Sequence, residues 1–202
     1  DDGNEQPLRG LTVLDIGCGG GILAESMARL GAEVTGIDVV EKNIAIATQH
    51  AARSGLKVNY KLSTVENLAW IGSQFDVVLN MEVVEHVNGL DGFMESSCRL
   101  LKPGGMMFIA TINRTLIAWL VAIVGAEYIL RWMPKGTHRL AMFRKPSEIR
   151  DLLAQNNLVV NDLVGVGVNP LVKRMFLTRL KSVNYMLTAV HALEGPLRKA
   201  KV

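Results

Sequence analysis

The chain has 202 residues, of which 49% are hydrophobic, so it can bury one full core and we expect a single domain over residues 1–202. Its two cysteines, Cys18 and Cys98, are too few for a disulfide framework and lack the spacing of a zinc site. The net charge is +3, but residues 1–130 carry 9 basic and 15 acidic side chains, whereas residues 131–202 carry 13 and 4. The basic last third favours an anionic surface, and with only 5% aromatic residues we expect a membrane as partner and no nucleic acid.

Short apolar runs alternate with segments of helical periodicity along most of the chain. This alternation predicts an α/β fold, a Rossmann-like, doubly wound and mostly parallel seven-stranded sheet, with a helical insertion after strand five. A turn at Lys102-Pro103-Gly104-Gly105 precedes that fifth strand. The expected strands are 12–16, 33–37, 57–62, 76–80, 105–111, 157–167 and a last segment at 182–191, and the expected helices are 22–30, 41–53, 89–101 and one that begins near Pro146.

The insertion, residues 116–138, consists of a segment that is apolar almost all round, followed by a polar loop. Its apolar core runs for 11 residues from Leu116 to Ala126, whereas crossing a bilayer takes about 20. We therefore predict a helix at the membrane interface, or a lid over the substrate. A core helix or a dimer contact is the alternative. The predicted membrane contacts are Leu116, Trp119, Leu120, Ile123, Tyr128 and Trp132, and the predicted substrate or lid residues are His138 and Asn113.

The first strand ends in the sequence Asp15-Ile16-Gly17-Cys18-Gly19-Gly20-Gly21. Glycines between a strand and a helix let a ligand approach the backbone closely. The pattern is G-x-G-x-G, so it is neither the dinucleotide fingerprint nor a Walker loop. Asp15, and Asp38 at the end of the second strand, predict a site for a cationic nucleoside, with Asp38 on the ribose. The alternative is that Asp38 only caps a helix.

A second group, Glu82, Glu85 and His86, follows the fourth strand at positions i, i+3 and i+4. If a helical turn follows this strand, the three side chains share one face at the edge of the sheet where ligands bind, and they could hold a divalent cation. Alternatively, His86 lines the pocket or acts as a general base without a metal. Glu25 and His50 have the spacing of ordinary helix-surface residues.

Four motifs together resemble the class I S-adenosylmethionine-dependent methyltransferases. They are D-I-G-C-G-G-G at 15–21, G-I-D at 36–38, F-D-V-V at 75–78 and L-K-P-G-G at 101–105. The resemblance implies S-adenosylmethionine as cofactor, bound near Asp15, Gly17, Gly19, Gly21 and Asp38. It also implies cofactor contacts from Val39, Thr64, Val65 and Met81.

Longer stretches resemble the ubiquinone-biosynthesis O-methyltransferases, above all VGAEYILRWMPKGTH at 124–138 and MEVVEHV at 81–87. This resemblance implies methylation of a polyprenylated catechol, a divalent metal, magnesium, on Glu82, Glu85 and His86, and contacts with other ubiquinone-biosynthesis proteins. It implies the matrix face of the mitochondrial inner membrane, or alternatively the bacterial cytoplasm or the cytoplasmic face of the membrane. A helical segment that precedes the glycine motif in relatives is absent from this sequence. The alternatives are a methyltransferase for another lipid or small phenol, and a non-catalytic, membrane-recruiting subunit.

Overall fold

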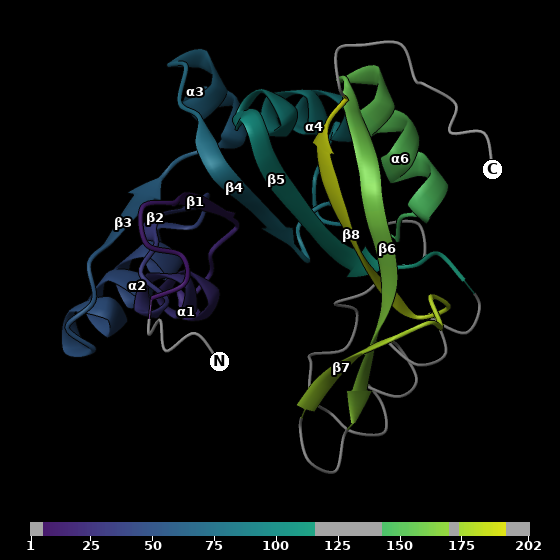
Figure 1. The fold of residues 1–202 in the computed structure, drawn as a ribbon. Coiled ribbons are helices and arrows are strands. Elements are labelled where there is room, and N and C mark those ends of the chain that lie inside the picture. The colour runs from purple at the N-terminus through teal and green to yellow at the C-terminus, as the bar shows by residue number, and fades with distance from the viewer. Residues whose placement is uncertain (1–5, 116–142, 170–173, 193–202) are drawn as a thin grey trace.

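The computed structural model describes residues 6–115, 143–169 and 174–192. They form one eight-stranded sheet in the order β3-β2-β1-β4-β5-β8-β6-β7, with helices on both faces (Figure 1). The strands are β1 Thr12–Ile16, β2 Glu33–Asp38, β3 Val58–Leu62, β4 Phe75–Met81, β5 Leu101–Ile112, β6 Leu158–Asn169, β7 Arg174–Thr178 and β8 Asn184–His191. The helices are α1 Ile22–Arg29, α2 Glu41–Arg53, α3 Val65–Trp70, α4 Leu90–Arg99 and α6 Pro146–Gln155.

The sheet is mixed, so the prediction of seven mostly parallel strands was wrong. Strands β1 to β5 pair in parallel, whereas β8 is antiparallel to β5 and β6, and β7 is antiparallel to β6. The unpredicted strand is β7, which pairs with the far end of β6. Its sequence, Arg-Met-Phe-Leu-Thr, does not alternate between apolar and polar residues. Alternation arises when one face of a strand is buried, and here all residues but the last are exposed. A pattern search for half-buried strands therefore misses it.

The predicted bounds of most other elements agree with the structure to within a few residues, but two features differ. Helix α3 was not predicted, because its six residues are too few for a helical period to show. The Thr64 hydroxyl caps this helix by accepting from the backbone N–H of Asn67 at 3.3 Å. The predicted turn at 102–105 lies inside β5 as a bulge. Here the pairing with β4 jumps from Phe75–Leu101 to Val77–Met106.

The core lies on both faces of the sheet, as doubly wound folds require. On one face Val13, Val34 and Leu79 pack with Ala24 of α1. On the other face, alternate strand residues such as Leu14 and Val78 pack with α4 and α6. Because β1, β2 and β4 are parallel, their carboxyl ends meet at one edge of the sheet, and the residues that follow them are brought together there.

The predicted insertion at 116–138 lies outside the described residues, and so do Leu116, Trp119, Leu120, Ile123, Tyr128, Trp132 and His138. In the part of the chain that the structure describes, no helix has the length and apolar character needed to cross a bilayer.

Candidate active site

The glycine turn after β1 has the backbone conformation that its sequence predicts. Gly17, Gly19 and Gly21 have φ angles of 66°, 53° and 85°, which other residues rarely adopt. Steric crowding is a second reason why Gly17 and Gly21 must be glycine. A Cβ on Gly17 would lie 2.6 Å from Val83 Cγ2, and one on Gly21 would lie 2.2 Å from the Tyr60 hydroxyl. Only Gly19 faces open space, so packing demands glycine at 17 and 21 as much as a ligand's approach does.

Asp38 at the end of β2 ties this turn to the start of α2. Its carboxylate accepts from the backbone N–H of Gly19 at 3.0 Å and of Val40 at 2.8 Å, and from the Asn43 side chain at 3.2 Å. It thus supports the start of α2 and also lines the pocket described below. These contacts use part of the carboxylate's acceptor capacity, which is about four lone-pair directions.

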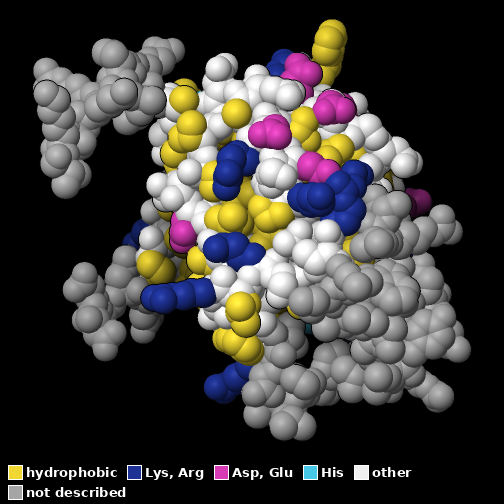
Figure 2. Space-filling model, turned by 90° about the vertical axis from the view of Figure 1, so that its right-hand side faces the viewer, with side chains coloured by type: hydrophobic (Ala, Val, Ile, Leu, Met, Phe, Trp, Pro, Cys, Tyr) yellow, Lys and Arg dark blue, Asp and Glu magenta, His cyan; other side chains and the backbone are white. Residues whose placement is uncertain are grey.

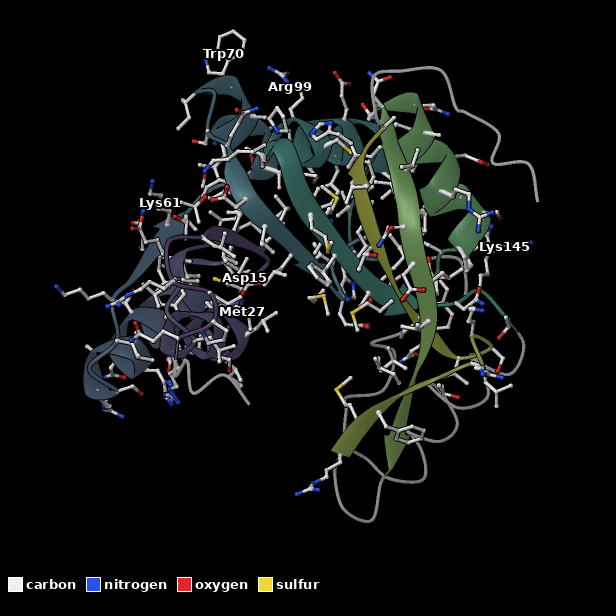
Figure 3. All side chains as sticks on the ribbon, viewed as in Figure 1. Asp15, Met27, Lys61, Trp70, Arg99 and Lys145 are labelled. Atoms are coloured by element: carbon white, nitrogen blue, oxygen red, sulfur yellow. The ribbon has the colours of Figure 1, made fainter. Side chains whose placement is uncertain are left out.

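Asp15 lies beneath the turn and is 3% exposed (Figure 3). Its Oδ2 atom has no hydrogen-bond partner in the described part of the chain. Burial raises the pKa of Asp15 to about 7; a backbone hydrogen bond from Ala24 opposes this shift, and the negative charge of Asp38 adds to it. A buried carboxyl oxygen without a partner is costly, which makes it a candidate to receive a donor from a ligand.

A pocket of about 460 Å³ opens at this edge, within the size range of small-molecule sites. It brings together Gly17, Asp38, Val39, Thr64, Val65, Glu82 and His86 of the residues that the sequence singled out. It is not lined by Asp15, Gly19, Gly21, Met81, Glu85 or Asn113. Its walls also include apolar residues that the sequence did not single out as site residues, among them Ile37, Val40, Val83, Val87 and Phe93. An apolar residue in a pocket wall has the same sequence signal as one in the core, so pattern alone could not separate them.

The segment after β4 is a turn, so the prediction that Glu82, Glu85 and His86 share a helical face was wrong. Glu82 has a φ of 57°, in the left-handed region, and the N–H of His86 closes the turn on the carbonyl of Val83 at 2.8 Å. Glu82 and His86 line the pocket, whereas Glu85 is 3% exposed and accepts from the Thr111 hydroxyl at 2.7 Å.

The two carboxyl groups of this turn interact with each other. The surrounding protein desolvates Glu82, and Glu85 adds its negative charge and a hydrogen bond, so the pKa of Glu82 is raised well above its usual range. Among the described residues, no three His, Cys, Asp or Glu side chains are grouped so that they could hold a metal ion.

Glu25 and His50 are not the separate surface residues that their helical spacing predicted. Glu25 of α1 is 3% exposed, and its carboxylate lies 2.5 Å from Nδ1 of His50 on α2 and 3.2 Å from the Arg29 guanidinium. The side chains of His50 and Arg29 remain more than half exposed and cover Glu25 from outside. This contact joins the two helices that begin beside the pocket, and no pattern within either helix reveals it.

Asn113, predicted at the substrate or lid, has a structural role at the end of β5. Its side-chain amide donates to the Lys181 carbonyl at 2.7 Å, and its backbone N–H donates to the Val183 carbonyl at 2.7 Å. Asn113 therefore holds the segment before β8 against the edge of the sheet that carries the pocket. A contact with substrate remains a prediction.

Comparison with known proteins agrees with this geometry. A family model described as a methyltransferase domain matches residues 14–109. Among solved structures, the magnesium protoporphyrin IX methyltransferase from Synechocystis PCC 6803 with bound SAH superposes with a TM-score of 0.68 at 22% identity, over 92% of this chain and 76% of that one. A SAM-dependent methyltransferase from Methanosarcina mazei gives 0.69 at 20% identity, over 95% and 96%. These likenesses show the fold.

Relatives of higher identity identify the family. The ubiquinone biosynthesis O-methyltransferase of Sinorhizobium medicae is 53% identical over 189 residues, which are 94% of this chain and 76% of that protein. The protein of the same name from Chelativorans sp. is 52% identical over 197 residues, 98% of this chain and 76% of that protein. The chain therefore belongs to the ubiquinone biosynthesis O-methyltransferases, within the class I methyltransferase fold.

Proposed function

We propose that this protein transfers a methyl group from S-adenosylmethionine to a phenolic oxygen of a polyprenylated catechol in ubiquinone biosynthesis. The observation that carries the proposal is the pocket, where the glycine turn and Asp38 lie on one side and Glu82 and His86 on the other. One side suits a nucleoside and the other suits proton removal. The family of the chain supports the same reaction.

The residues that line the pocket, together with Asp15 and Gly19 of the neighbouring glycine turn, fit the cofactor. Apolar side chains of Val39, Val40 and Val65 can enclose a base, and Asp38 can accept from ribose hydroxyls. The unpartnered Oδ2 of Asp15 suits a donor from the cationic amino acid part, directly or through water. When bound, S-adenosylmethionine supplies an electrophilic methyl group on a sulfonium. Three independent observations support binding of this cofactor: the Asp15 Oδ2 atom that has no partner among the described residues, the open space beside Gly19, and the volume of the pocket.

The chain's own contribution to the reaction is positioning and removal of the phenolic proton. Phe93, Val83 and Val87 line the pocket and can exclude water from the reacting atoms. His86 lines the same pocket, so its imidazole can accept the phenolic proton. We assign His86 as the general base, with Glu82 and the buried Glu85 as the acidic groups beside it.

Magnesium on Glu82, Glu85 and His86 was the other route predicted for proton removal. The described residues do not fit it as they stand, because Glu85 bonds to Thr111 and Glu82 lies against Glu85. Magnesium also prefers oxygen ligands to imidazole. We therefore derive no step through a metal.

The substrate's tail and the location of the protein are part of the proposal. A polyprenyl tail places the substrate in a bilayer, and we keep the insertion at 116–133 and an anionic membrane surface as proposed contacts. The relatives from Sinorhizobium medicae and Chelativorans sp. are bacterial proteins, so we favour the cytoplasmic face of a bacterial membrane over the mitochondrial inner membrane. A methyltransferase for another lipid, a methyltransferase for a soluble phenol and a non-catalytic subunit are the competing functions.

Turnover on matched substrates tests the proposal. We expect methylation of a polyprenylated catechol and slower methylation of the same catechol without its tail. His86→Ala should lower the rate by roughly 10²–10⁴-fold while leaving cofactor affinity unchanged. Exhaustive chelation should leave the wild-type rate intact. Loss of rate on chelation, restored by added magnesium, would instead show that a metal removes the proton.

A further inference from the structure

Tyr60 of β3 lies against the end of the glycine turn, although it does not line the pocket. In the sheet it pairs with Gly36 of β2, and its ring lies across that residue: a Cβ on Gly36 would meet the Cδ1 and Cε1 atoms of Tyr60 at 2.8 Å. The Tyr60 hydroxyl reaches the last residue of the turn and donates to the Gly21 carbonyl at 3.3 Å. One side chain therefore touches both the glycine turn and the strand that ends in Asp38.

The glycine at position 36 is not required by its own backbone. Gly36 is not one of the residues with a positive φ, so a residue with a side chain could adopt its conformation. Space is what excludes one, because its Cβ would lie 2.8 Å from the Tyr60 ring and 3.1 Å from Cys18 Cβ. A glycine inside a strand weakens the strand and often marks a site that another group approaches closely. At position 36 the approaching group is the ring of Tyr60.

Gly21 begins α1 without a side chain of its own to cap the helix. It is the N-cap residue, with φ of 85° and ψ of 8°. Its carbonyl accepts from the backbone N–H of Glu25 at 2.9 Å, within the first turn of α1, and the Tyr60 hydroxyl is a further donor to it. Burial raises the pKa of Tyr60 above its usual range and the charge of Glu25 adds to the shift, so the hydroxyl keeps its proton and remains a donor.

Among the described residues, β2 and β3 hold the glycine turn at three points. The backbone N–H of Cys18 donates to the Ile37 carbonyl at 2.9 Å, and that of Gly19 donates to Asp38 at 3.0 Å. These two bonds from β2 fix the middle of the turn. Tyr60 supplies the third point, from β3, at the end of the turn. Without Tyr60, the end of the turn and the start of α1 lose their link to the outer strand of the sheet.

The surroundings of Tyr60 leave no neighbour to replace its ring. Tyr60 also lines a cavity of about 610 Å³ between β2, β3 and α2, whose walls include Val34, Ala51 and Val58. A smaller side chain at position 60 would enlarge this cavity, because surrounding structure relaxes only partly into the space that a large side chain leaves. The support of the turn therefore depends on the aromatic ring as well as on the hydroxyl.

We propose that Tyr60 is a positioning residue for S-adenosylmethionine: its ring, seated in the space that Gly36 leaves, and its hydroxyl on the Gly21 carbonyl fix the end of the glycine turn in the geometry that the cofactor binds. The inference rests on the proposed function for the identity of the cofactor. In the sheet order β3-β2-β1-β4, Tyr60 lies far from the turn after β4 that carries Glu82 and His86. Tyr60 therefore sets the KM for S-adenosylmethionine and not kcat.

Two substitutions separate the hydroxyl from the ring. Tyr60→Phe removes only the hydroxyl, and we expect the Kd of S-adenosylhomocysteine and the KM for S-adenosylmethionine to rise roughly two- to five-fold, because a neutral hydrogen bond of this length is weak. Tyr60→Val also removes the ring but keeps a side chain that suits a strand, and it should raise both constants at least about ten-fold. With saturating cofactor, kcat on a tail-less catechol should remain at the wild-type value.

Tyr185→Phe is the matched control. The Tyr185 hydroxyl donates to the Arg144 carbonyl at 3.1 Å, so this variant loses the same kind of bond. Tyr185 belongs to β8, in the half of the sheet with β6 and α6 that faces the viewer in Figure 2, whereas β3 is the edge strand at the other end of the sheet (Figure 1). We expect Tyr185→Phe to lower the free energy of unfolding and to leave the Kd of S-adenosylhomocysteine unchanged.

A double-mutant cycle tests the packing of the ring on Gly36. Gly36→Ala should weaken S-adenosylhomocysteine binding in the wild type, because the new Cβ meets the Tyr60 ring. In the Tyr60→Val background the ring carbons are gone, so Gly36→Ala should cost less affinity. Equal costs in both backgrounds would mean that Cys18 alone demands glycine at position 36, and would contradict the role of the ring.

Urea denaturation of each variant separates positioning from stability alone. If Tyr60→Phe and Tyr60→Val lose stability but bind S-adenosylhomocysteine like the wild type, Tyr60 only supports the fold and the proposal is wrong. A fall in kcat at unchanged KM would also overturn it, since it would place Tyr60 in the chemistry. Tyr60→Phe keeps the ring and decides the matter if Tyr60→Val does not fold. Failure of the proposed function would appear separately, as a wild type that binds S-adenosylhomocysteine and methylates no catechol.

Discussion

The two sides of the pocket are built in different ways. On the side of the glycine turn, Asp38 accepts from backbone N–H groups of two segments, and Glu25 and His50 join the helices that follow them. On the side of β4, Glu82 and Glu85 lie against each other, and Glu82 has strained backbone dihedrals. The first arrangement holds a geometry that is complete before any ligand arrives. The second presents groups whose protonation can change, which suits residues that take part in chemistry.

The contrast predicts that breaking an internal bond of the first side weakens cofactor binding more than the loss of one ligand contact would. Asp38→Ala removes the acceptor for Gly19 and Val40 and the proposed ribose contact together. We expect the free energy of S-adenosylhomocysteine binding to weaken by roughly 1–3 kcal/mol, about 5- to 150-fold in affinity, because hydrogen bonds to a charged acceptor are lost. Calorimetry measures it, with Glu41→Ala at the start of α2, three residues further along the chain, as a control. An unchanged dissociation constant would mean that Asp38 only caps α2.

Asp15 is the exception on the side of the glycine turn, because its buried carboxyl group can change its protonation state near neutral pH. Its pKa is raised from 3.8 to about 7, so the folded protein keeps a proton that the unfolded chain has lost. The contribution of Asp15 to stability is therefore fully present below pH 3.8 and is lost as the pH rises through about 7. Asp15→Asn cannot ionise, so we expect it to flatten this dependence and to exceed the wild type by about 1–2 kcal/mol at pH 8.

Urea denaturation between pH 4 and pH 8 measures this effect. Parallel stability curves for Asp15→Asn and wild type would show that Asp15 ionises normally. The same variant should bind S-adenosylhomocysteine more weakly, because it replaces a carboxyl oxygen that has no partner within the described residues.

A smaller effect is expected from the contact between α1 and α2. His50→Ala removes a partner of the buried Glu25 carboxylate, but Arg29 remains and the His50 side chain is 57% exposed, so solvent screens the pair. We expect a loss of about 1 kcal/mol in the free energy of unfolding. In a Glu25→Gln background, His50→Ala should cost less, and this coupling is what a double-mutant cycle measures. Equal costs in both backgrounds would mean that His50 only packs there.

The sequence by itself determined the side of the pocket that follows β1 and β2. A strand, a run of glycines and a helix are each encoded within about ten neighbouring residues, so the turn at Gly17–Gly21 and the acid at Asp38 could be located before any contact was known. Most of the strands could be located for the same reason. Half-buried and buried strands leave a pattern in their own residues.

Only the tertiary structure decided the burial of Glu25, the turn at Glu82–His86, the apolar wall at Phe93 and the exposed strand β7. These features depend on partners outside the local segment: His50 covers Glu25, the Thr111 hydroxyl donates a hydrogen bond to Glu85, and β6 pairs with β7. A local pattern records whether a residue is apolar or polar, but it does not record what lies opposite. Strand pairing and the packing of one helix against another determine which side chains are buried and which charges lie beside them. Burial and neighbouring charge shift pKa values, and these decide which side chains can do chemistry.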